Sequence, residues 1–119
     1  MKADVGKQLG DSDWLTGDQD RSNKFADATS DQPWIHVDIA RAAKEMPGGK
    51  TIAHGFLTLS LLVVLLDSVY KIEKTSRGTN YGSHKVRLTS MAPSCCPIRP
   101  HHTLTALAEV DGGVPVTFP

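Results

Sequence analysis

The sequence predicts an α+β fold, and three features of its pattern lead to that prediction. Two short segments with helical character, residues 18–29 and 39–46, precede a long apolar segment over residues 51–70. Beyond that segment, the spacing of apolar residues changes from a helical period towards alternation, which is typical of strands. Helices followed by antiparallel strands indicate an α+β domain, and 119 residues suit a single domain over residues 1–119.

The beginning of the chain predicts one strand and one helix. Spaced apolar residues between glycines over residues 5–16 suit a short edge strand. Residues 18–29 predict a helix because acidic side chains occupy its first turn, where the helix dipole favours them. Its buried side is expected to carry Phe25, Ala26 and Ala28.

Pro33 separates this helix from a second one. The residue before a proline is pushed out of the α region, so the first helix has to end before this point. Residues 34–38 are expected to be irregular. Asp38 is expected to cap a second helix over residues 39–46, which the Pro-Gly-Gly sequence at residues 47–49 ends.

Residues 51–70 predict a buried central helix. Their apolar side chains leave almost no polar face, so such a helix has to be covered on nearly every side. About 20 helical residues extend over about 30 Å, which is the width of a small domain. A membrane span is not expected, because the uninterrupted apolar run, residues 61–66, falls well short of about 18 residues.

The rest of the chain predicts antiparallel strands that would have to wrap this helix. Residues 79–88 and 98–110 each suit a strand. Gly112 and Gly113 suit a hairpin turn into a last strand over residues 114–118.

Composition and charge narrow the class of function. Thirteen basic and thirteen acidic residues balance, so nothing favours nucleic acid or an anionic membrane surface as a partner. The N-terminus lacks the apolar core of a signal peptide, and the adjacent Cys95 and Cys96 cannot join distant segments by a disulfide. We therefore expect a cytoplasmic protein in a reducing compartment.

Asp31 and His36 form the first candidate for chemistry. A carboxylate and an imidazole five positions apart in an irregular segment are able to converge on one water molecule and to move a proton. The alternative is structural: Asp31 caps a turn and His36 packs beside Trp34. Spacing alone leaves both interpretations open.

His54 and Gly55, near the start of the central helix, form the second candidate. Glycine lets a ligand approach the backbone closely, and the amides of a first helical turn have no intrahelical partner, so together they suit stabilisation of an oxyanion. Alternatively, Gly55 only permits close packing against a strand. Both interpretations remain open at this point.

Three motifs carry a resemblance to a known family. An Asp-x4-His motif occupies residues 31–36, an Ala-His-Gly motif residues 53–55 and an Asn-Tyr-Gly motif residues 80–82. In this order and spacing they closely resemble the MaoC-like, (R)-specific enoyl-CoA hydratase family, over a match that runs from about residue 5 to residue 88 and resumes over about residues 98–118. The resemblance implies the hotdog fold, in which an antiparallel sheet wraps a long central helix, and a dimer that extends the sheet.

The resemblance also implies an activity: reversible syn hydration of a trans-2-enoyl-CoA to the (R)-3-hydroxyacyl-CoA, a hydro-lyase reaction of fatty acid metabolism. Asp31 and His36 would hold and activate the water that attacks C3 and supply the proton delivered to C2. The Gly55 amide would polarise the thioester carbonyl, with His54 and Asn80 at the oxyanion and substrate-binding positions. No metal or redox cofactor is expected, and coenzyme A would be part of the substrate.

The sequence departs from the family pattern after residue 88. Cysteine stands where a turn glycine is expected, and Pro97 and Pro100 replace residues that would donate hydrogen bonds to a sheet. A metal site is an alternative role for the cysteines and histidines of the C-terminal half, although their spacing is not a known zinc motif. The residues in question are His84, Cys95, Cys96, His101 and His102.

The end of the sequence is the second departure. Family members continue beyond the Gly-Gly hairpin, so we expect a C-terminally truncated domain that lacks its last wrapping strand. An unpaired sheet edge and an exposed apolar helix would favour a homodimer or a higher homo-oligomer. The same shortening supports an alternative function, a catalytically inactive hotdog module for acyl-thioester binding or oligomerisation. A thioesterase-like hotdog that hydrolyses acyl-CoA is the third interpretation.

Overall fold

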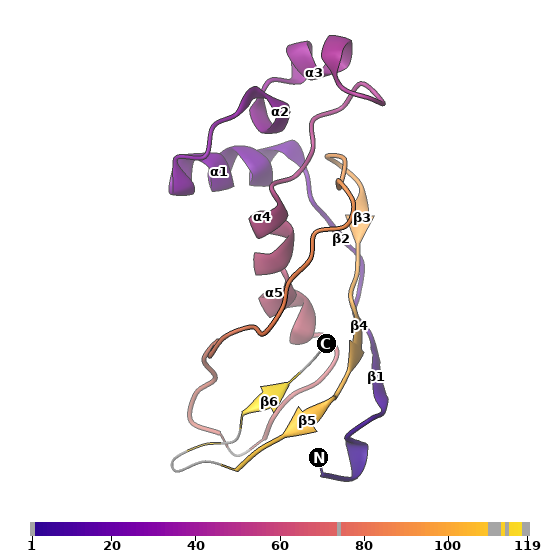
Figure 1. The fold of residues 1–119 in the computed structure, drawn as a ribbon, viewed down its shortest axis with the longest axis vertical. Helices are drawn as coiled ribbons and strands as arrows, with labels where there is room; N and C mark the ends of the chain where they lie inside the picture. Colours follow the sequence, from indigo (N-terminus) through magenta and orange to yellow (C-terminus); the bar gives the residue numbers. More distant parts are fainter. Residues whose placement is uncertain (1, 74, 110–112, 114, 118–119) are drawn as a thin grey trace. The chain divides into compact units, whose positions relative to one another are not determined.

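Short helices and two-stranded antiparallel sheets make up the chain, which confirms the α+β class (Figure 1). The computed structural model describes residues 2–73, 75–109, 113 and 115–117. Two units are distinguished: the first comprises residues 1–13, 64–86 and 99–119, and the second comprises residues 14–63 and 87–98. The single domain expected over residues 1–119 stays a prediction.

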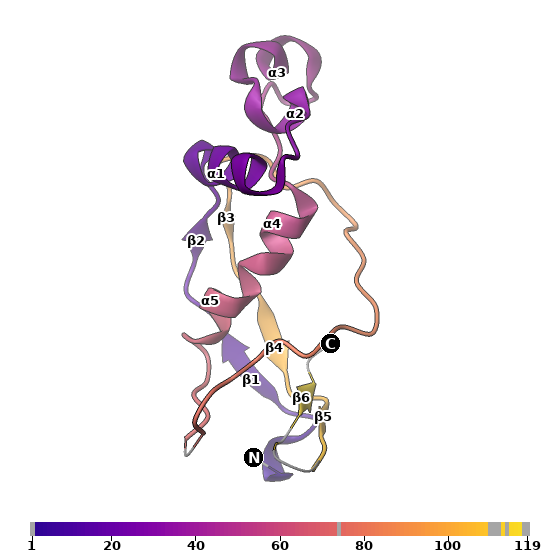
Figure 2. The same ribbon diagram turned by 90° about the vertical axis from the view of Figure 1, so that its left-hand side faces the viewer.

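The second unit contains most of the helices. Its elements are β2 (Leu15–Thr16), α1 (Gln19–Thr29), α2 (Trp34–Val37), α3 (Ile39–Glu45), α4 (Gly55–Ser60) and β3 (Pro97–Ile98). Strands β2 and β3 pair in antiparallel orientation, with Leu15 opposite Ile98. Helix α2 lies next to both α1 and α3 in the two ribbon views (Figures 1 and 2). Helix α5 (Leu62–Leu66) follows α4 in the chain and spans the division between the units.

Helix α1 forms where the sequence predicts it. Asp18 caps its N-terminus by accepting a 2.9 Å hydrogen bond from the backbone amide three residues on. Ser22 and Ala26, four residues apart, are buried, and Phe25 is half-buried. Ala28 is exposed, so its predicted place in the core is wrong. It lies two positions beyond Ala26, and this spacing turns it away from the buried stripe of the helix.

Residues 34–38 are not irregular, and that prediction is wrong. Helix α2 begins directly after Pro33, whose fixed φ suits the start of a helix. The amide of His36 donates to the carbonyl of Pro33 at 3.0 Å, and that of Asp38 donates to the carbonyl of Trp34 at 2.9 Å, which closes a single helical turn. Asp38 then caps α3, as predicted, by accepting a 2.9 Å hydrogen bond from a backbone amide of that helix.

The central helix is shorter and less buried than the sequence predicts. Helical structure is limited to α4 and α5 with Leu61 between them, rather than extending over residues 51–70. Leu57, Leu61 and Leu65 form one buried stripe at a spacing of four residues. Phe56, by contrast, is 71% exposed. The prediction of a helix covered on nearly every side is therefore wrong, because only one stripe finds partners in the described chain.

Serine hydroxyls donate to helix carbonyls beside the interruption at Leu61 and beyond the end of α5. Ser60 Oγ donates to the carbonyl of Leu57 at 2.7 Å, and the same carbonyl accepts the amide of Leu61 at 3.1 Å. Ser68 Oγ likewise donates to the carbonyl of Leu65 at 2.8 Å, just beyond the end of α5. Side-chain donors of this kind compete with the backbone hydrogen bonds and bend or end helices. In the part of the chain that the structure describes, no helix has the length and apolar character needed to cross a membrane.

The first unit contains two small antiparallel sheets and the 3-10 helix η1 (Lys2–Asp4). Strand β1 (Gln8–Asp11) pairs with β4 (His101–Thr103), and β5 (Ala106–Leu107) pairs with β6 (Val116–Thr117). The predicted N-terminal strand is confirmed in part, because β1 and β2 both lie within residues 5–16. The single strand predicted over residues 98–110 is wrong: it is divided among β3, β4 and β5. Pro100, which has no amide to donate, lies at the first interruption.

Two further predictions of strand structure have different outcomes. Residues 79–88 form no strand and are exposed throughout, so the strand predicted there is wrong. A strand is stable only when a neighbour pairs with it, and Gly82 in the middle of this segment weakens the strand preference further. The hairpin turn expected at Gly112 and Gly113 lies partly outside the described residues, which include Gly113 but not Gly112. The strand expected over residues 114–118 is confirmed in part by β6, whereas residues 114 and 118 lie outside the described residues.

The turn around Cys95 forms without its expected glycine. Cys95 adopts a φ of 67°, in the left-handed region that glycine favours. Its amide donates to the carbonyl of Gly17 at 2.9 Å, and the amide of Cys96 donates to the carbonyl of Pro93 at 3.3 Å. These hydrogen bonds hold the cysteine in a conformation that is unusual for its residue type. Both cysteines are free thiols.

Candidate active site

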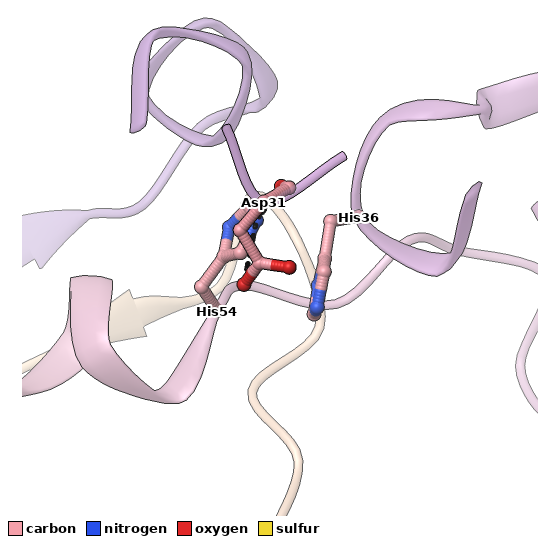
Figure 3. Close-up of side chains that lie close together, drawn as sticks. All are labelled: Asp31, His36 and His54. Carbon is pink, nitrogen blue, oxygen red and sulfur yellow. Dashed lines mark hydrogen bonds and ion pairs between the residues drawn. The ribbon is translucent and has the colours of Figure 1, made fainter. Parts of the chain in front are cut away.

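Asp31, His36 and His54 come together from three separate segments of the second unit (Figure 3). Asp31 follows α1, His36 lies on α2, and His54 directly precedes α4. A carboxylate oxygen of Asp31 and one ring nitrogen of each histidine all lie within 4.8 Å of one another. The structure thus brings together the two residues of the predicted acid-base pair and one of the residues predicted to bind the substrate.

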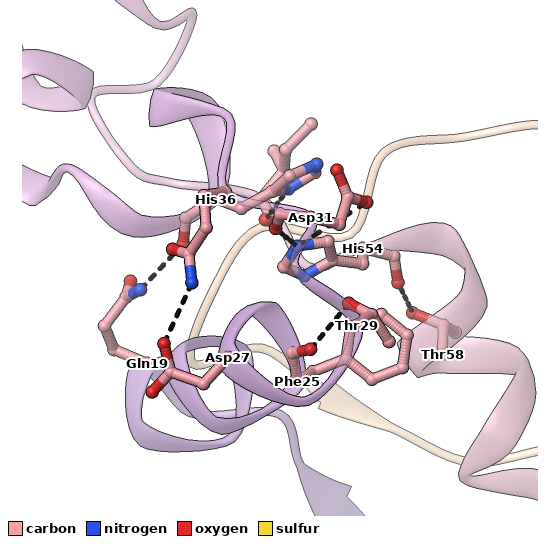
Figure 4. Close-up of polar contacts among 10 residues, drawn as sticks. Gln19, Phe25, Asp27, Thr29, Asp31, His36, His54 and Thr58 are labelled. Carbon is pink, nitrogen blue, oxygen red and sulfur yellow. Dashed lines mark hydrogen bonds and ion pairs between the residues drawn. The ribbon is translucent and has the colours of Figure 1, made fainter.

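The end of α1 determines where Asp31 lies. Ser30 adopts a left-handed conformation, with a φ of 59°, and this conformation ends the helix and redirects the chain. Gln32 Nε2, on the other side of Asp31, donates a 2.8 Å hydrogen bond to Asp27 Oδ1 (Figure 4). The carboxylate of Asp31 remains 52% exposed, so a bound substrate or a water molecule is able to reach it.

Hydrogen bonds determine the orientation and the tautomer of His36. Its Nδ1 lies 2.8 Å from the carbonyl oxygen of Ile52. A carbonyl oxygen only accepts, so Nδ1 carries the hydrogen and Nε2 is left with a free lone pair. The amide of Ile52 donates in turn to the carbonyl of Ile35 at 3.0 Å, which joins α2 to the segment before α4. The imidazole is thereby set up to accept a proton at Nε2.

His54 is the buried member of the cluster, with only 2% of its side chain exposed. Its Nε2 lies 2.9 Å from the main-chain oxygen of Asp31 and 3.9 Å from Oδ2 of the same residue. The shorter distance is a hydrogen bond and the longer one is not. The rings of His54 and His36 are stacked, with centroids 3.8 Å apart and planes at 25°. The carboxylate of Asp31 therefore makes no hydrogen bond to His54 and remains available to a water molecule.

A buried polar network that the sequence did not indicate supports the backbone around this cluster. Gln19 Nε2 donates to the main-chain oxygen of His36 at 2.7 Å, a contact that Figure 4 shows. Thr51 Oγ1 donates to Gln19 Oε1 at 2.5 Å, so the 2.6 Å contact between Thr51 Oγ1 and Ser94 Oγ is a hydrogen bond donated by the serine. No spacing or motif in the sequence distinguishes Gln19 or Thr51 from other polar residues.

Gly55 lines a cleft of about 290 Å³ beside His36. Leu88 and Met91, from a later segment of the chain, also line this cleft. A Cβ atom added to Gly55 would lie 2.2 Å from Cδ1 of Leu88, which is too close unless the leucine side chain moves. Close packing is thus one reason for a glycine here, although the packing partner is an irregular segment rather than a strand.

Comparison with known proteins identifies the family. A family model described as the MaoC like domain matches residues 1–116. The chain belongs to this family. Membership confirms the resemblance carried by the three sequence motifs, and it implies the hotdog fold.

Relatives of this MaoC-like domain carry two names. The 3-hydroxyacyl-thioester dehydratase Z of Mycobacterium tuberculosis (strain ATCC 25618 / H37Rv) is 42% identical over 113 residues, which are 95% of this chain and 74% of that protein. Nodulation protein N of Rhizobium leguminosarum bv. viciae is 45% identical over 102 residues, 85% of this chain and 63% of that protein. The Rhizobium meliloti (strain 1021) protein of the same name is 52% identical over 87 residues, 72% of this chain and 54% of that protein. The first name supports a family of hydro-lyases.

Asn80 of the MaoC-like domain belongs to the first unit, whereas the histidine cluster belongs to the second. It lies in the exposed irregular segment where a strand was predicted. Its assignment to the substrate-binding site therefore stays a prediction, and so do the roles assigned to the other site residues.

The same three side chains are a possible metal-ligand set, since two imidazoles and a carboxylate suit divalent transition metals. Metal–nitrogen bonds lie near the plane of the imidazole, at about 2.0–2.1 Å. The rings of His36 and His54 are stacked, so their in-plane lone pairs do not point at a shared position between them. The geometry suits acid-base chemistry better than metal binding.

The other residues considered as metal ligands are distributed over both units. Cys95 and Cys96 lie in the second unit, whereas His101 and His102 lie in the first. His101 Nδ1 lies 2.5 Å from Asp11 Oδ1, and this contact lowers the pKa of the Asp11 carboxyl. His101 therefore has a structural partner within its own sheet.

Proposed function

We propose that this MaoC-like domain adds water reversibly to a trans-2-enoyl-CoA and forms the (R)-3-hydroxyacyl-CoA. The observation that carries the proposal is the convergence of the Asp31 carboxylate and the His36 imidazole beside a cleft of about 290 Å³. Family membership and a relative named as a 3-hydroxyacyl-thioester dehydratase support the reaction class.

The proposed reaction uses one water molecule between Asp31 and His36. A carboxylate oxygen of Asp31 and a ring nitrogen of His36 lie within 4.8 Å of each other, which is short enough for both groups to contact one water molecule. Asp31 accepts a hydrogen bond from this water, and Nε2 of His36 takes a proton from it as its oxygen attacks C3. The proton then passes to C2 on the same face. Water is thereby added across the double bond, and both side chains return to their starting states.

Gly55 is proposed to polarise the thioester carbonyl through its amide. Gly55 is the first residue of α4, so its amide has no acceptor within the helix. The residue lines the same cleft as His36, which supports placing the carbonyl and the reacting double bond side by side. Hydrogen bonding to the carbonyl oxygen stabilises the negative charge that develops there when water attacks C3.

The proposed chemistry requires neither a metal nor a redox cofactor, and coenzyme A enters only as part of the substrate. General acid-base catalysis combined with a polarised carbonyl is sufficient for hydration of a conjugated thioester. We predict that incubation with EDTA followed by desalting leaves the hydration rate unchanged. Loss of activity that zinc or another divalent ion restores would contradict this prediction.

The domain is further proposed to act as a homodimer or higher homo-oligomer in cytoplasmic fatty acid metabolism. Phe56, Val63 and Val64 are each more than half exposed on α4 and α5, and water-exposed apolar surface of this kind favours association. Light scattering coupled to size-exclusion chromatography tests the assembly. A monomer at all concentrations would contradict this part of the proposal.

The test of the proposed function is the loss of enoyl-thioester absorbance when the purified protein is mixed with crotonyl-CoA. Hydration by the unmodified protein and not by Asp31→Asn is expected. Release of free thiol instead of loss of the double bond would favour the thioesterase interpretation and overturn the hydratase.

A catalytically inactive acyl-thioester-binding or oligomerisation module is the second candidate. The interrupted α4–α5 helix and the irregular segment over residues 79–88 favour it, because both depart from the hotdog arrangement that the family implies. Binding of crotonyl-CoA without any turnover by a folded protein would support this module and exclude the enzyme.

A further inference from the structure

His54 is buried in a way that its polarity does not explain. The side chain is 2% exposed and makes no hydrogen bond that caps α4. Its Nδ1 is buried without a hydrogen-bond partner among the described residues. Burying a polar group in this way costs free energy, and an apolar ring of similar size would avoid that cost. The contacts of the other ring atoms indicate what the imidazole contributes.

The first contact fixes the backbone of Asp31. His54 Nε2 lies 2.9 Å from the main-chain oxygen of Asp31 and therefore carries the hydrogen of the neutral ring, because that oxygen only accepts (Figures 3 and 4). Asp31 lies immediately after the left-handed Ser30, at a point where the chain leaves α1 and no helical hydrogen bond holds it. The imidazole supplies the missing restraint and leaves the carboxylate of Asp31 free.

The second contact fixes the ring of His36. The two imidazoles are stacked at a centroid distance of 3.8 Å, and Phe25 also packs against His54, with ring centroids 4.9 Å apart. The hydrogen bond from His36 Nδ1 to Ile52 holds one atom of the His36 ring. Stacking against His54 restricts rotation of that ring about this hydrogen bond, so Nε2 keeps its direction.

We infer that His54 is a positioning residue for the proposed hydration: it holds Asp31 through a main-chain hydrogen bond and His36 through ring stacking, and it does not contact the substrate. The inference rests on the proposed function for its catalytic consequence. It differs from the substrate-binding role that the family resemblance implies, because a side chain that is 2% exposed offers no surface to a ligand.

Three variants separate the two contacts. His54→Gln places an amide donor near the position of Nε2 and removes the ring. His54→Phe keeps a ring for stacking and removes the donor. His54→Ala removes both. His84→Phe, at an exposed histidine, serves as the control and should behave like the unmodified protein.

The kinetic test measures kcat and KM for crotonyl-CoA together with the thermal unfolding midpoint. His54→Ala should lower kcat about 100-fold, the effect of displacing reacting groups by about 1 Å, with KM changed less than about twofold. His54→Gln should restore part of kcat. His54→Phe should unfold at the same temperature as the unmodified protein or a higher one and still lose turnover, which a purely structural role would not produce.

A measurement independent of activity tests the contacts themselves. Nitrogen NMR spectra should place the ring hydrogen of His54 on Nε2 and that of His36 on Nδ1. The ring-proton resonances of His36 should shift in His54→Ala, which loses the stacked ring, and remain close to their original positions in His54→Phe.

Three results would distinguish the possibilities. A folded His54→Phe or His54→Ala variant with unchanged kcat would overturn the inference, as would a rise in KM at constant kcat, which would make His54 a substrate contact. Unshifted His36 resonances in His54→Ala would overturn it as well. If the unmodified protein has no hydratase activity while the spectra show both contacts, the proposed function fails and the placement of Asp31 and His36 by His54 stands.

Discussion

Gly55 and Leu88 show how single residues limit the shape of the site. Gly55 lines the cleft next to His36, and a Cβ atom at this position would lie 2.2 Å from Leu88 Cδ1 and 3.3 Å from Leu88 Cγ. Relief of this clash requires the leucine side chain to move. The wall of the cleft and the start of α4 are therefore coupled through Leu88 and Gly55.

We predict that Gly55→Ala destabilises the protein by up to about 1 kcal/mol, less than the usual cost of inserting a methyl group into a packed core, because Leu88 is 57% exposed and its side chain is able to move. Because the obstructing atoms belong to a flexible side chain, Leu88→Ala should recover most of this loss in the double variant. Urea unfolding of the two single variants and the double variant measures the coupling. Strictly additive effects would show that the contact does not limit this position.

The pair of Asp31 and His36 is the part of the site that the sequence indicates well. Their spacing is local, and a chain reversal near Pro33 is enough to bring the two side chains together. The buried position of His54 is different, because it depends on how the segment before α4 packs against α1 and α2. A pattern in the sequence shows that His54 precedes a helix but not which way its ring points.

At the scale of elements, the Gln19 network connects the start of α1, the helix α2 and the segment before α4. Gln19 donates to the carbonyl of His36 and accepts from Thr51, while Ser94 donates to the same threonine. Thr51 and Ser94 are both buried, so an unpaired hydroxyl here would be costly. The network thus holds α1, α2 and the segment before α4 together next to the site, where in the described chain no backbone hydrogen bonds of a helix continue from one of these elements to the next.

Gln19→Ala is predicted to lower the free energy of unfolding by about 1–3 kcal/mol, because it removes the 2.7 Å donor to the main-chain oxygen of His36 and one of the two hydrogen-bond partners of the buried Thr51 hydroxyl. Asn23→Ala is the matched control: Asn23 is exposed and contacts the same Gln19 amide at 2.9 Å, so its loss should change stability by less than about 0.5 kcal/mol. Chemical unfolding of both variants provides the comparison. Equal stability of the two variants would show that the network contributes little.

Elements with local signals were predictable from the sequence, and elements that depend on distant partners were not. Asp18 and Asp38 each predict the start of a helix, and both helices form where expected, because a capping hydrogen bond involves neighbouring residues only. The strand expected over residues 79–88 would require a neighbouring strand to pair with it. The alternation of side chains in the sequence does not show whether such a neighbour is present. No proline or glycine occurs within residues 56–66, so the sequence carries no local signal for the break at Leu61.

At the scale of the whole chain, buried histidine links stability to pH. Burial lowers the pKa of His102 from its ordinary value of 6.5, and the neighbouring His101 lowers it further. In the unfolded state, by contrast, His102 takes up a proton at its ordinary pKa. Between the two pKa values the unfolded state binds more protons, so stability rises with pH in that window.

The stabilising effect of neutral His102 should be present above pH 6.5 and be lost as the pH falls from there through the lowered pKa. His102→Leu should accordingly flatten the dependence of the unfolding free energy on pH below 6.5. The exposed His84→Ala variant should leave that dependence as it is. An unchanged slope in His102→Leu would show that another group is responsible.

The proposed hydration requires Asp31 and His36 to act on one water molecule, and a double-variant cycle tests this most directly. Crotonyl-CoA hydration is measured for Asp31→Asn, His36→Ala and the two combined, with Asp20→Asn as the control at an exposed carboxylate of α1. Each single variant should lose a factor of about 10²–10⁴ in turnover. The double variant should lose no more turnover than the less active of the two single variants, because the two groups act as a unit. Turnover retained by either single variant, or losses that multiply in the double variant, would contradict the shared water.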